Sequence, residues 1–582
     1  MPLTPLDIPA GVYRHGTDLE GANRWRDVNL VRWRNGSIQP IGGWVFREKT
    51  GASINEAPRG AIAWVDNSFN SNIAVGTASK LFYISSGNAV TDITPAGFTA
   101  GNEDAQVNVG YGGNFYGTGL YGVSRPYSGV FQECTTWSLD TWGEYLVGCS
   151  VDDGKLYEWQ LNTANPAAVI TNAPTNCSGL VVTEERFLFA LAAGGNPRKV
   201  QWSDKEDNTT WAPLATNEAG DIELQTNGEI LSGHRMRART LILTTTDAHV
   251  ATYIGPQLVF SFERVGTSCG AISRKACIAN QEGAFWMGQK GFFMFNGSSV
   301  EEMRCDVLDY VFEDVNRAQQ SKIWAVHNSQ YGEAWWFYPS SDSNVNNRYV
   351  IFDYKEGHWS IGKIERSAGF DAGVFSSPIW FSNSGAMYDH EKNYSYGDYI
   401  PYAETGPLVL GPEVIKVNSF IPDEKTQGAL KLEFKTRFYP NDVERSYGPY
   451  DPSNPTSVRF SGRQIRMKIY NDAEIDSNAL LYGFLKAGTG IDPYEQLLSV
   501  RVDGRMIGDI DNDGRLTSGD TSAYNKYING LLAIPEQVAW IEDVLYPYIL
   551  DNIVEYAPFV SSSSGAWRFG LPRLNIIQGG RR

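Results

Sequence analysis

The sequence predicts a mainly β protein: a β-propeller of about six to seven blades, then a C-terminal β domain that carries a small helical calcium-binding insertion. Apolar strands that end in Gly- or Asp-rich turns recur about every 40–60 residues, near the length of one four-stranded blade. The 13% aromatic content and the 59 glycines of the 582-residue chain are typical of a folded, turn-rich protein. A pair of β-sandwiches is the alternative fold for the same pattern.

Residues 1–54 form an N-terminal arm in which arginines and aromatic residues interleave. The pattern comprises Tyr13, Arg14, Trp25, Arg26, Trp33 and Arg34. Such residues can bind nucleic acid, with arginine on phosphates and rings on bases. The formal net charge of −17 argues against a chain that coats nucleic acid. We therefore predict a hairpin whose arginines stack on tryptophan faces at a protein interface.

The predicted propeller spans residues 55–400, and its recurring unit is a hairpin with alternating apolar positions. The units carry no WD or kelch signature. The hairpins lie at residues 72–84, 144–159, 186–202, 239–254, 283–297, 334–362 and 377–390. Their spacing favours a propeller over two sandwiches.

One helical segment interrupts the strands at residues 301–322. Val307, Tyr310, Val311 and Val315 make an apolar stripe between acidic residues. The simplest interpretation is a short helix packed on the rim of the propeller. A helix that binds a partner is the alternative.

Residues 401–471 and 565–582 are predicted to form the C-terminal β domain, and residues 472–564 to be an insertion within it. The segment "SVRFSGRQIRMKIYND" alternates apolar and basic residues, and "AWRFGLPRLNIIQGGRR" has the same mix. We expect these two segments to pair in one sheet. The insertion is expected to be mostly helical, with helices at residues 493–504 and 534–549.

Within the insertion, "DIDNDGRLTSGD" has the spacing of an EF-hand calcium loop, with oxygen ligands at positions 1, 3, 5 and 12 and glycine at position 6. The predicted ligands are Asp509, Asp511, Asp513, the backbone carbonyl of Arg515, a water held by Thr517, and Asp520. The shorter aspartate at position 12, where glutamate is usual, resembles the calcium loops of dockerin modules. An acidic surface turn without an ion is the alternative. Because the clustered carboxylates would repel one another without a cation, Ca²⁺ is the predicted cofactor.

The position of this loop bears on its role. Dockerin loops occur as a tandem pair that docks through its exit helices, whereas this sequence shows one loop inside an insertion. We therefore expect Ca²⁺ to stabilise the shape of residues 472–564. Docking of a partner on the insertion remains the alternative.

The sequence offers no convincing catalytic site. Its six histidines include no close pair, and it has no GxSxG, P-loop or GxGxxG motif. The neighbouring acids Asp152 and Asp153 fall in a hairpin turn. We expect a protein that is not an enzyme.

The six cysteines are isolated from one another, which favours small buried side chains in a reducing cytoplasm. The N-terminal residues have neither the basic nor the apolar region of a signal peptide. No apolar run approaches the ~20 residues that a membrane span needs. We expect a protein that is made in the cytoplasm, without a membrane span.

Several motifs carry a resemblance to a known family. The stretch "AGVYRHGTDLEGANRWRDVNLVRWRNGSIQPIGGW" (10–44) looks like the start of tail proteins of short-tailed bacteriophages (podoviruses). The hairpin "IAVGTASKLFYI" with the following "DITPAG" fits their first propeller hairpin, and "GRQIRMKI" and "WRFGLPRLNIIQGGRR" resemble their closing strands. The family is the tail nozzle, also called tail tubular protein B. The resemblance covers nearly the whole chain, with 472–564 as its variable part.

The resemblance implies a structural virion protein. Nozzle subunits form a homohexameric ring below the adaptor (head-to-tail connector) ring, close the DNA channel before infection, and contact tail fibres or tailspikes. Genomic double-stranded DNA would pass without specific binding, and the N-terminal arm would contact the adaptor or a neighbouring subunit. The protein would be made in the host cytoplasm and reside in the virion tail.

Two rival functions remain open from the sequence. One is a calcium-stabilised propeller that binds a glycan or a cell-surface ligand. The other is a glycan hydrolase, which needs two carboxylates about 5–10 Å apart across a cleft.

Overall fold

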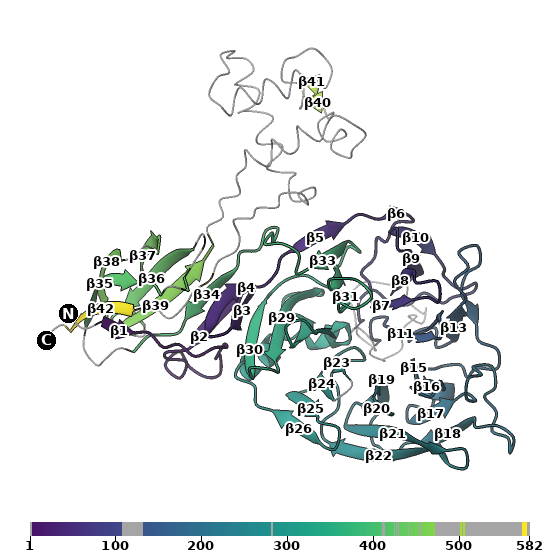
Figure 1. Cartoon of the computed structure of the whole chain (residues 1–582). Coiled ribbons are helices and arrows are strands. Elements are labelled where there is room, and N and C mark those ends of the chain that lie inside the picture. Colours follow the sequence, from purple (N-terminus) through teal and green to yellow (C-terminus); the bar gives the residue numbers. More distant parts are fainter. Residues whose placement is uncertain are drawn as a thin grey trace, which may run out of the picture.

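The computed structural model describes residues 3–106, 132–280, 283–409 and 414–471, with gaps at 424, 427, 429, 440 and 453–454, together with the short segments 501–502, 505–506, 568 and 573–578. Within this part of the chain, a β-propeller lies beside a smaller β domain (Figure 1). The predicted fold class, a propeller followed by a β domain, is confirmed.

Seven antiparallel sheets make up the propeller, and the first six are built from consecutive strands. Blade 1 comprises β7 (Gly60–Val65), β8 (Ser71–Gly76), β9 (Leu81–Ile84) and β10 (Ala89–Asp92). Blade 2 comprises β11 (Trp137–Trp142), β12 (Tyr145–Ser150), β13 (Leu156–Trp159) and β14 (Ala168–Val169). Blade 3 comprises β15 (Gly179–Val182), β16 (Leu188–Leu191), β17 (Lys199–Trp202) and β18 (Gly220–Glu223). A short strand, β6 (Thr50–Gly51), adds in parallel to β10.

The next three blades follow the same plan. Blade 4 comprises β19 (Ile230–Met236), β20 (Arg239–Thr244), β21 (Asp247–Gly255) and β22 (Val259–Thr267). Blade 5 comprises β23 (Cys277–Ala279), β24 (Ala284–Met287), β25 (Phe292–Phe295) and β26 (Val300–Met303). Blade 6 comprises β27 (Trp324–Asn328), β28 (Glu333–Pro339), β29 (Asn346–Asp353) and β30 (His358–Lys363). The first strands of successive blades contact one another in a closed circuit, so they are the innermost strands around the central channel.

The seventh blade closes the ring with a strand from the other end of the chain. Its first three strands are β31 (Ala368–Phe370), β32 (Ile379–Phe381) and β33 (Met387–His390). The fourth is β5 (Trp44–Arg47), which pairs antiparallel with β33. The predicted range of 55–400 therefore misses one strand of the propeller.

All seven predicted hairpins contain the two middle strands of a blade, and 334–362 also includes the outer strand β30; the residues of the middle strands are mostly buried. Both faces of a blade pack against neighbouring blades, so these strands are apolar on both sides. Trp137 of blade 2 packs so closely on blade 1 that a Cβ on Gly76 would lie 2.3 Å from its Cγ. Glycine at position 76 is therefore required by the contact between the two blades.

The predicted helix at 301–322 is shorter than expected. Val300–Met303 is the outer strand of blade 5, α1 spans Leu308–Asp314, and a 3₁₀ helix, η2, spans Arg317–Lys322. The side chain of Asn316 accepts a hydrogen bond from the Ala318 N–H, which starts η2. The predicted apolar stripe is buried at Val307, Val311 and Val315. A second short 3₁₀ helix, η1 (Ala193–Gly195), joins β16 to β17.

Two sheets form the β domain. One contains β1 (Leu3–Pro5), β42 (Arg573–Gln578), β35 (Ile415–Ile421) and β38 (Thr456–Gly462), in that order, and the other contains β2 (Trp25–Asn29), β34 (Tyr402–Thr405), β39 (Gln464–Tyr470), β36 (Lys431–Arg437) and β37 (Arg445–Tyr450). The rings of Phe434 and Phe460, one from each sheet, lie 4.8 Å apart between centroids. The two sheets thus share a core.

The predicted pairing of the two closing segments needs correction. β42 pairs directly with β1 and β35, and β39 lies in the other sheet. Only β38 shares a sheet with β42, and β35 separates them. The two segments have the same alternation of residues because each strand faces the shared core on one side. Alternation does not specify which strands are neighbours.

The N-terminal arm is divided among several sheets. β1 and β2 belong to the two sheets of the β domain, β5 closes the propeller, and β3 (Val31–Arg34) pairs with β4 (Ser37–Pro40) as a hairpin between them. In the insertion, β40 (Arg501–Val502) pairs with β41 (Arg505–Met506), where the end of a helix was expected. A pairing of extended residues excludes a helix there.

Candidate functional site

The residues of the arginine- and tryptophan-rich motif join the propeller to the β domain. The Val12 N–H donates to the Trp359 carbonyl (2.8 Å) in blade 6, and the Lys363 N–H donates to Asn29 Oδ1 (2.8 Å). β2 pairs with β34 of the β domain. We call residues 11–44, with the side chains packed on them, the domain junction.

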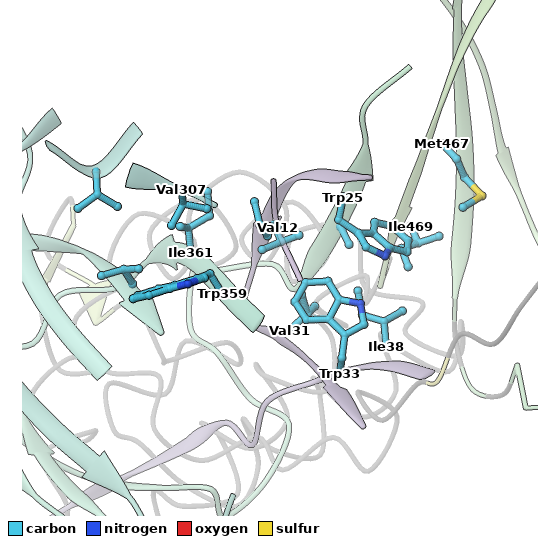
Figure 2. Packing of buried hydrophobic residues seen from close by; sticks show 14 of the residues in the cluster. Val12, Trp25, Val31, Trp33, Ile38, Val307, Trp359, Ile361, Met467 and Ile469 are labelled. Carbon is cyan, nitrogen blue, oxygen red and sulfur yellow. The ribbon is translucent and has the colours of Figure 1, made fainter. Parts of the chain in front are cut away.

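A hydrophobic core fills the domain junction. Figure 2 shows Val12, Trp25, Val31, Trp33 and Ile38 between propeller residues on one side and β-domain residues on the other. The propeller residues labelled there are Val307, Trp359 and Ile361, and the β-domain residues are Met467 and Ile469. This continuous cluster gives the two domains one shared core.

The motif was predicted to face another protein, and for its tryptophans that prediction is wrong. Trp25 and Trp33 are each only 3% exposed, and the chain itself covers them. Sequence alone could not distinguish an interface between proteins from one between domains, since both favour the same residues.

The arginines of the motif stack on tyrosines of the same chain. Arg14 lies 4.0 Å from the ring centre of Tyr310 in α1, and Arg32 lies 3.5 Å from that of Tyr331. Arg26 pairs with Asp18 at 2.8 Å. The predicted stacking on tryptophan is therefore replaced by stacking on tyrosines from distant parts of the sequence.

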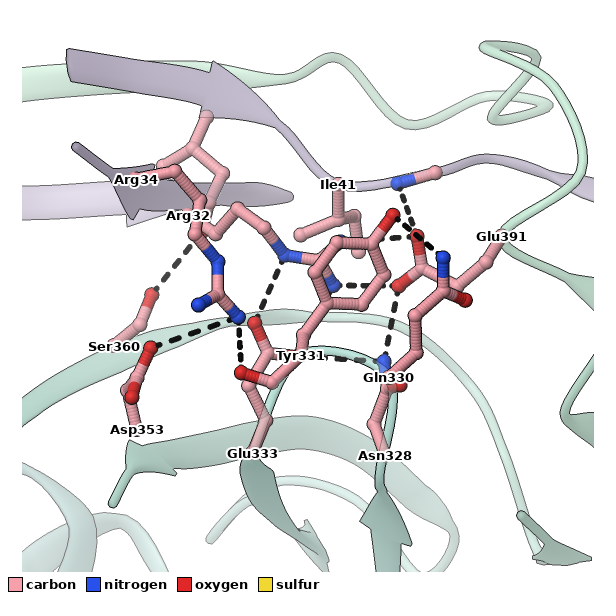
Figure 3. Close-up of polar contacts among 12 residues, drawn as sticks. Arg32, Arg34, Ile41, Asn328, Gln330, Tyr331, Glu333, Asp353, Ser360 and Glu391 are labelled. Carbon is pink, nitrogen blue, oxygen red and sulfur yellow. Dashed lines mark hydrogen bonds and ion pairs between the residues drawn. The ribbon is translucent and has the colours of Figure 1, made fainter. Parts of the chain in front are cut away.

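At the centre of the junction, Arg32 is buried between two glutamates, as Figure 3 shows. Its Nε donates to Glu333 Oε1 (2.8 Å), its Nη2 to Glu333 Oε2 (3.0 Å), and its Nη1 to Glu391 Oε2 (3.0 Å). The Gly42 N–H donates to Glu391 Oε2 (2.8 Å), and Trp335 Nε1 donates to Glu333 Oε2 (2.9 Å). Arg32 comes from β3, Glu333 from blade 6 and Glu391 from the end of blade 7, so the cluster ties the arm to both blades.

The charges of this Arg32 cluster are matched inside the protein. Burial alone would lower the pKa of Arg32, but the two carboxylates outweigh it and raise that pKa. Burial raises the pKa of Glu333, Arg32 opposes this rise, and Glu391 adds to it. Because every nitrogen of the guanidinium donates to a carboxylate, the cluster has no free group for a substrate. Its role is to hold the junction together.

A second group of ionisable side chains, partly buried except for the exposed Arg235, lies in the propeller channel, around a cavity of about 210 Å³. Its ionisable lining residues are Asp140, His234, Arg235, Arg274 and Lys275. They come from β11, from β19 and from the segment before β23. We call this group the channel cluster.

A larger cavity, of about 690 Å³, lies between blades 4 and 5. Its lining is rich in hydroxyl and amide groups, and it includes Phe293 and the buried Asp247. Burial would raise the pKa of Asp247, but hydroxyl groups of Thr226, Thr244 and Thr246 hold it below its usual value. The charges of the lining balance, with Asp247 and Glu302 against Arg264 and Lys290.

The predicted calcium ligands, Asp509, Asp511, Asp513, Arg515, Thr517 and Asp520, lie outside the described residues. Among the residues that are described, no group of three or more His, Cys, Asp or Glu side chains could hold a metal ion. The calcium loop thus stays a prediction from sequence.

Two further sequence expectations concern cysteines and membranes. All six cysteines are free, and five of them are buried, as predicted. Burial raises the pKa of Cys277, and of Cys177 to about 12. Over the described ranges, no helix has both the length and the apolar character of a membrane span.

Comparison with known proteins finds only distant structural similarity. No family model matches the sequence, and no curated protein matches it. Similar solved structures include a streptogramin B lyase (8% identity, TM-score 0.35, covering 59% of this chain and 96% of that chain) and BamB from Moraxella catarrhalis (9%, 0.33, 62% and 92%). The WD40 domain of Neurospora crassa Pan2 is a third (9%, 0.32, 59% and 96%). At these identities and TM-scores no function is transferred, and the expected lack of catalysis stays a prediction.

Proposed function

We propose that this chain is a structural subunit of the tail nozzle of a short-tailed bacteriophage. Six copies would form a ring that continues and gates the DNA channel below the adaptor ring and supports tail fibres or tailspikes. In this role the chain is not an enzyme, and it resides in the virion tail.

One observation carries the proposal. The residues that resemble the start of nozzle proteins, 10–44, include those that join the propeller to the β domain. The resemblance implies a propeller with further β domains, so the motif would be retained because it builds the connection between them. Outside the calcium loop, the motifs quoted for the resemblance thus have a structural reason in this chain.

The net charge supports a channel wall. Six chains of −17 would carry about −100 in one ring, a field that repels DNA phosphates. Repulsion would let the genome pass without being held. The same charge disfavours proteins that bind nucleic acid tightly.

The mass of the purified chain in solution, with calcium and with chelator, tests the proposal, followed by negative-stain imaging. We expect a six-fold ring with a central hole, or a monomer that forms such a ring on an adaptor ring. A monomer that remains single in the presence of adaptor rings would contradict the proposal.

A second candidate, a propeller that binds a glycan or a cell-surface ligand, is favoured by the 690 Å³ cavity. Its hydroxyl and amide lining, balanced charges and the Phe293 ring suit a neutral, polyhydroxylated ligand. A glycan array probed with the purified chain would test it. Binding that is lost in a Phe293→Ala variant would favour this function over the nozzle.

A further inference from the structure

The channel cavity is lined by charges that do not match one another. Within about 210 Å³, room for roughly seven waters at ~30 Å³ each, the lining carries three cations, Arg235, Arg274 and Lys275. Burial lowers the pKa of His234 to about 3, so this histidine is neutral at pH 7. Among the described lining residues Asp140 is the only carboxylate, and Glu133, outside the lining, lies 3.5 Å from Arg274 Nη2.

Asp140 is already committed to other partners. Its Oδ2 accepts from the Val182 N–H of the next blade (2.9 Å), and its Oδ1 accepts from the Thr141 N–H (2.8 Å). Arg235 Nη2 lies 3.8 Å from Oδ1. The carboxylate therefore bridges two blades and has little capacity left for a second cation.

Two donors of the cluster lack close partners. Arg274 Nη1 donates to the carbonyls of Ile230 and Leu231 (both 3.4 Å), but its Nε is buried without a hydrogen bond. In the part of the chain that the structure describes, no hydrogen bond or ion pair reaches the Lys275 ammonium. A buried donor without an acceptor destabilises the folded protein, and a buried charge without a partner destabilises it more.

We propose that the channel cavity binds a small oxyanion of phosphate size, held by the Lys275 ammonium and the Arg274 guanidinium. Such an anion would supply the missing negative charge and accept hydrogen bonds from both donors. The Ser232 hydroxyl, 3.0 Å from His234 Nε2, adds a neutral hydrogen-bonding group to the same wall. Burial lowers the pKa of Lys275 to about 8, so this lysine is mostly charged at pH 7 and can serve as the anchor.

The net charge of the protein excludes the explanation that anions bind at the channel cavity only because the whole protein attracts them. The chain as a whole is acidic, at −17, and repels anions at long range. Binding must therefore depend on the local donors of the channel. It does not depend on the nozzle proposal.

Titration of the full-length protein with inorganic phosphate at pH 7, by calorimetry and by ³¹P line broadening, tests the site. We expect saturable binding with one phosphate per chain. In Lys275→Met, which keeps the length of the side chain without its charge, affinity should fall by at least about tenfold. Lys275→Arg should retain binding, as should the control Lys416→Met, which removes an exposed lysine of the β domain.

The outcomes separate clearly. Saturable binding that is lost in Lys275→Met alone supports the site. Absence of saturation up to 10 millimolar phosphate, or equal weakening in Lys275→Met and Lys416→Met, overturns it. If Lys275→Met does not melt cooperatively, the unaltered protein and Lys275→Arg still decide the question, because both should bind phosphate. Chloride at equal ionic strength should not displace the bound phosphate from either protein.

Discussion

The Arg32 cluster and the channel cluster both bury charge, but they do so in opposite ways. Arg32 has two carboxylates, and each of its nitrogens donates to one of them. Lys275 has no hydrogen bond or ion pair from its ammonium among the described residues, and the lining carboxylate Asp140 already accepts two backbone N–H groups and lies 3.8 Å from Arg235. The first cluster is complete within the chain, whereas the second has cationic donors to spare.

From this difference we infer a structural role for the Arg32 cluster and a binding role for the channel cluster. Desolvating a charge is costly, so a buried charge persists where its partners repay the cost. In the domain junction those partners come from the same chain, which makes the cluster a connection between domains. In the channel, the part of the chain that the structure describes gives the Lys275 ammonium no hydrogen bond or ion pair, and the proposed anion would supply that partner.

The largest expected effect is on the complete cluster. Arg32→Met would leave Glu333 and Glu391 buried without their cation, and should destabilise the protein by about 3–5 kcal/mol. Urea denaturation followed by tryptophan fluorescence measures this. In the control Arg198→Met, which removes a half-exposed pair with Glu223, the loss should stay below about 1 kcal/mol. Equal losses of stability in the two variants would mean that the buried Arg32 cluster contributes no more than a half-exposed ion pair.

The predicted calcium loop is a third cluster of charges, in which four aspartates fall within residues 509–520 of the sequence. Asp509→Ala combined with Asp513→Ala should lower calcium affinity by at least about 100-fold, ~2.7 kcal/mol, since half of the four carboxylates are lost. Calcium titration and limited proteolysis check this. Residues 472–564 should become more sensitive to protease, while the propeller melts unchanged.

Asp543→Ala is a matched control for the loop, because it removes an acid of the insertion outside residues 509–520. It should bind calcium as the unaltered chain does. Proteolysis of 472–564 that is the same with calcium and with chelator would contradict a structural role for the ion.

We expect the channel cluster to make the stability of the protein depend on pH in alkaline solution. Burial lowers the pKa of Lys275 from 10.5 to about 8, so the unfolded state binds more protons between these values and stability rises with pH in this window. Lys275→Met should lose this rise, of the order of 3 kcal/mol. Denaturation in phosphate-free buffer from pH 7 to 10.5 measures it. Lys49, whose pKa burial also lowers to about 8, is present in both proteins, so their difference reports Lys275 alone.

The smallest effect is expected from Glu333→Gln, at less than about 1 kcal/mol, because Arg32 keeps Glu391. Burial raises the pKa of Glu333 above 4.5, so this group contributes stability below pH 4.5 that is lost as pH rises through the raised value. The variant should therefore gain less stability on acidification from pH 7 to 4.5. A cost as large as that of Arg32→Met would mean that the second carboxylate is not redundant.

The fold was predictable from sequence where the signal is local. Each middle hairpin of a blade is a contiguous apolar stretch with its own turn, so all seven could be located. The closing strand β5 could not, because Trp44 and Arg47 pair with His390 and Met387, far along the chain. Pairing between distant strands leaves no mark in a single sequence beyond ordinary strand propensity.

The site was predictable only in part, for the same reason. Arg32 lies within the arginine-rich motif, but its partners Glu333 and Glu391 look like ordinary surface acids in sequence. The channel cluster left no signal either, since Asp140, Lys275 and His234 come from three separate blades. Residue type indicated interface chemistry in the arm, and only the fold showed that the interface is internal.

Closure of the propeller by β5 has a consequence for synthesis on the ribosome. At about 5–20 residues per second, β5 emerges tens of seconds before β33, its only neighbour in the seventh blade. Until β33 emerges, β5 lacks the strand with which it pairs, and an unpaired strand edge is of the kind that associates with other chains. The nascent propeller therefore becomes a closed ring only after residue 390 has left the ribosome.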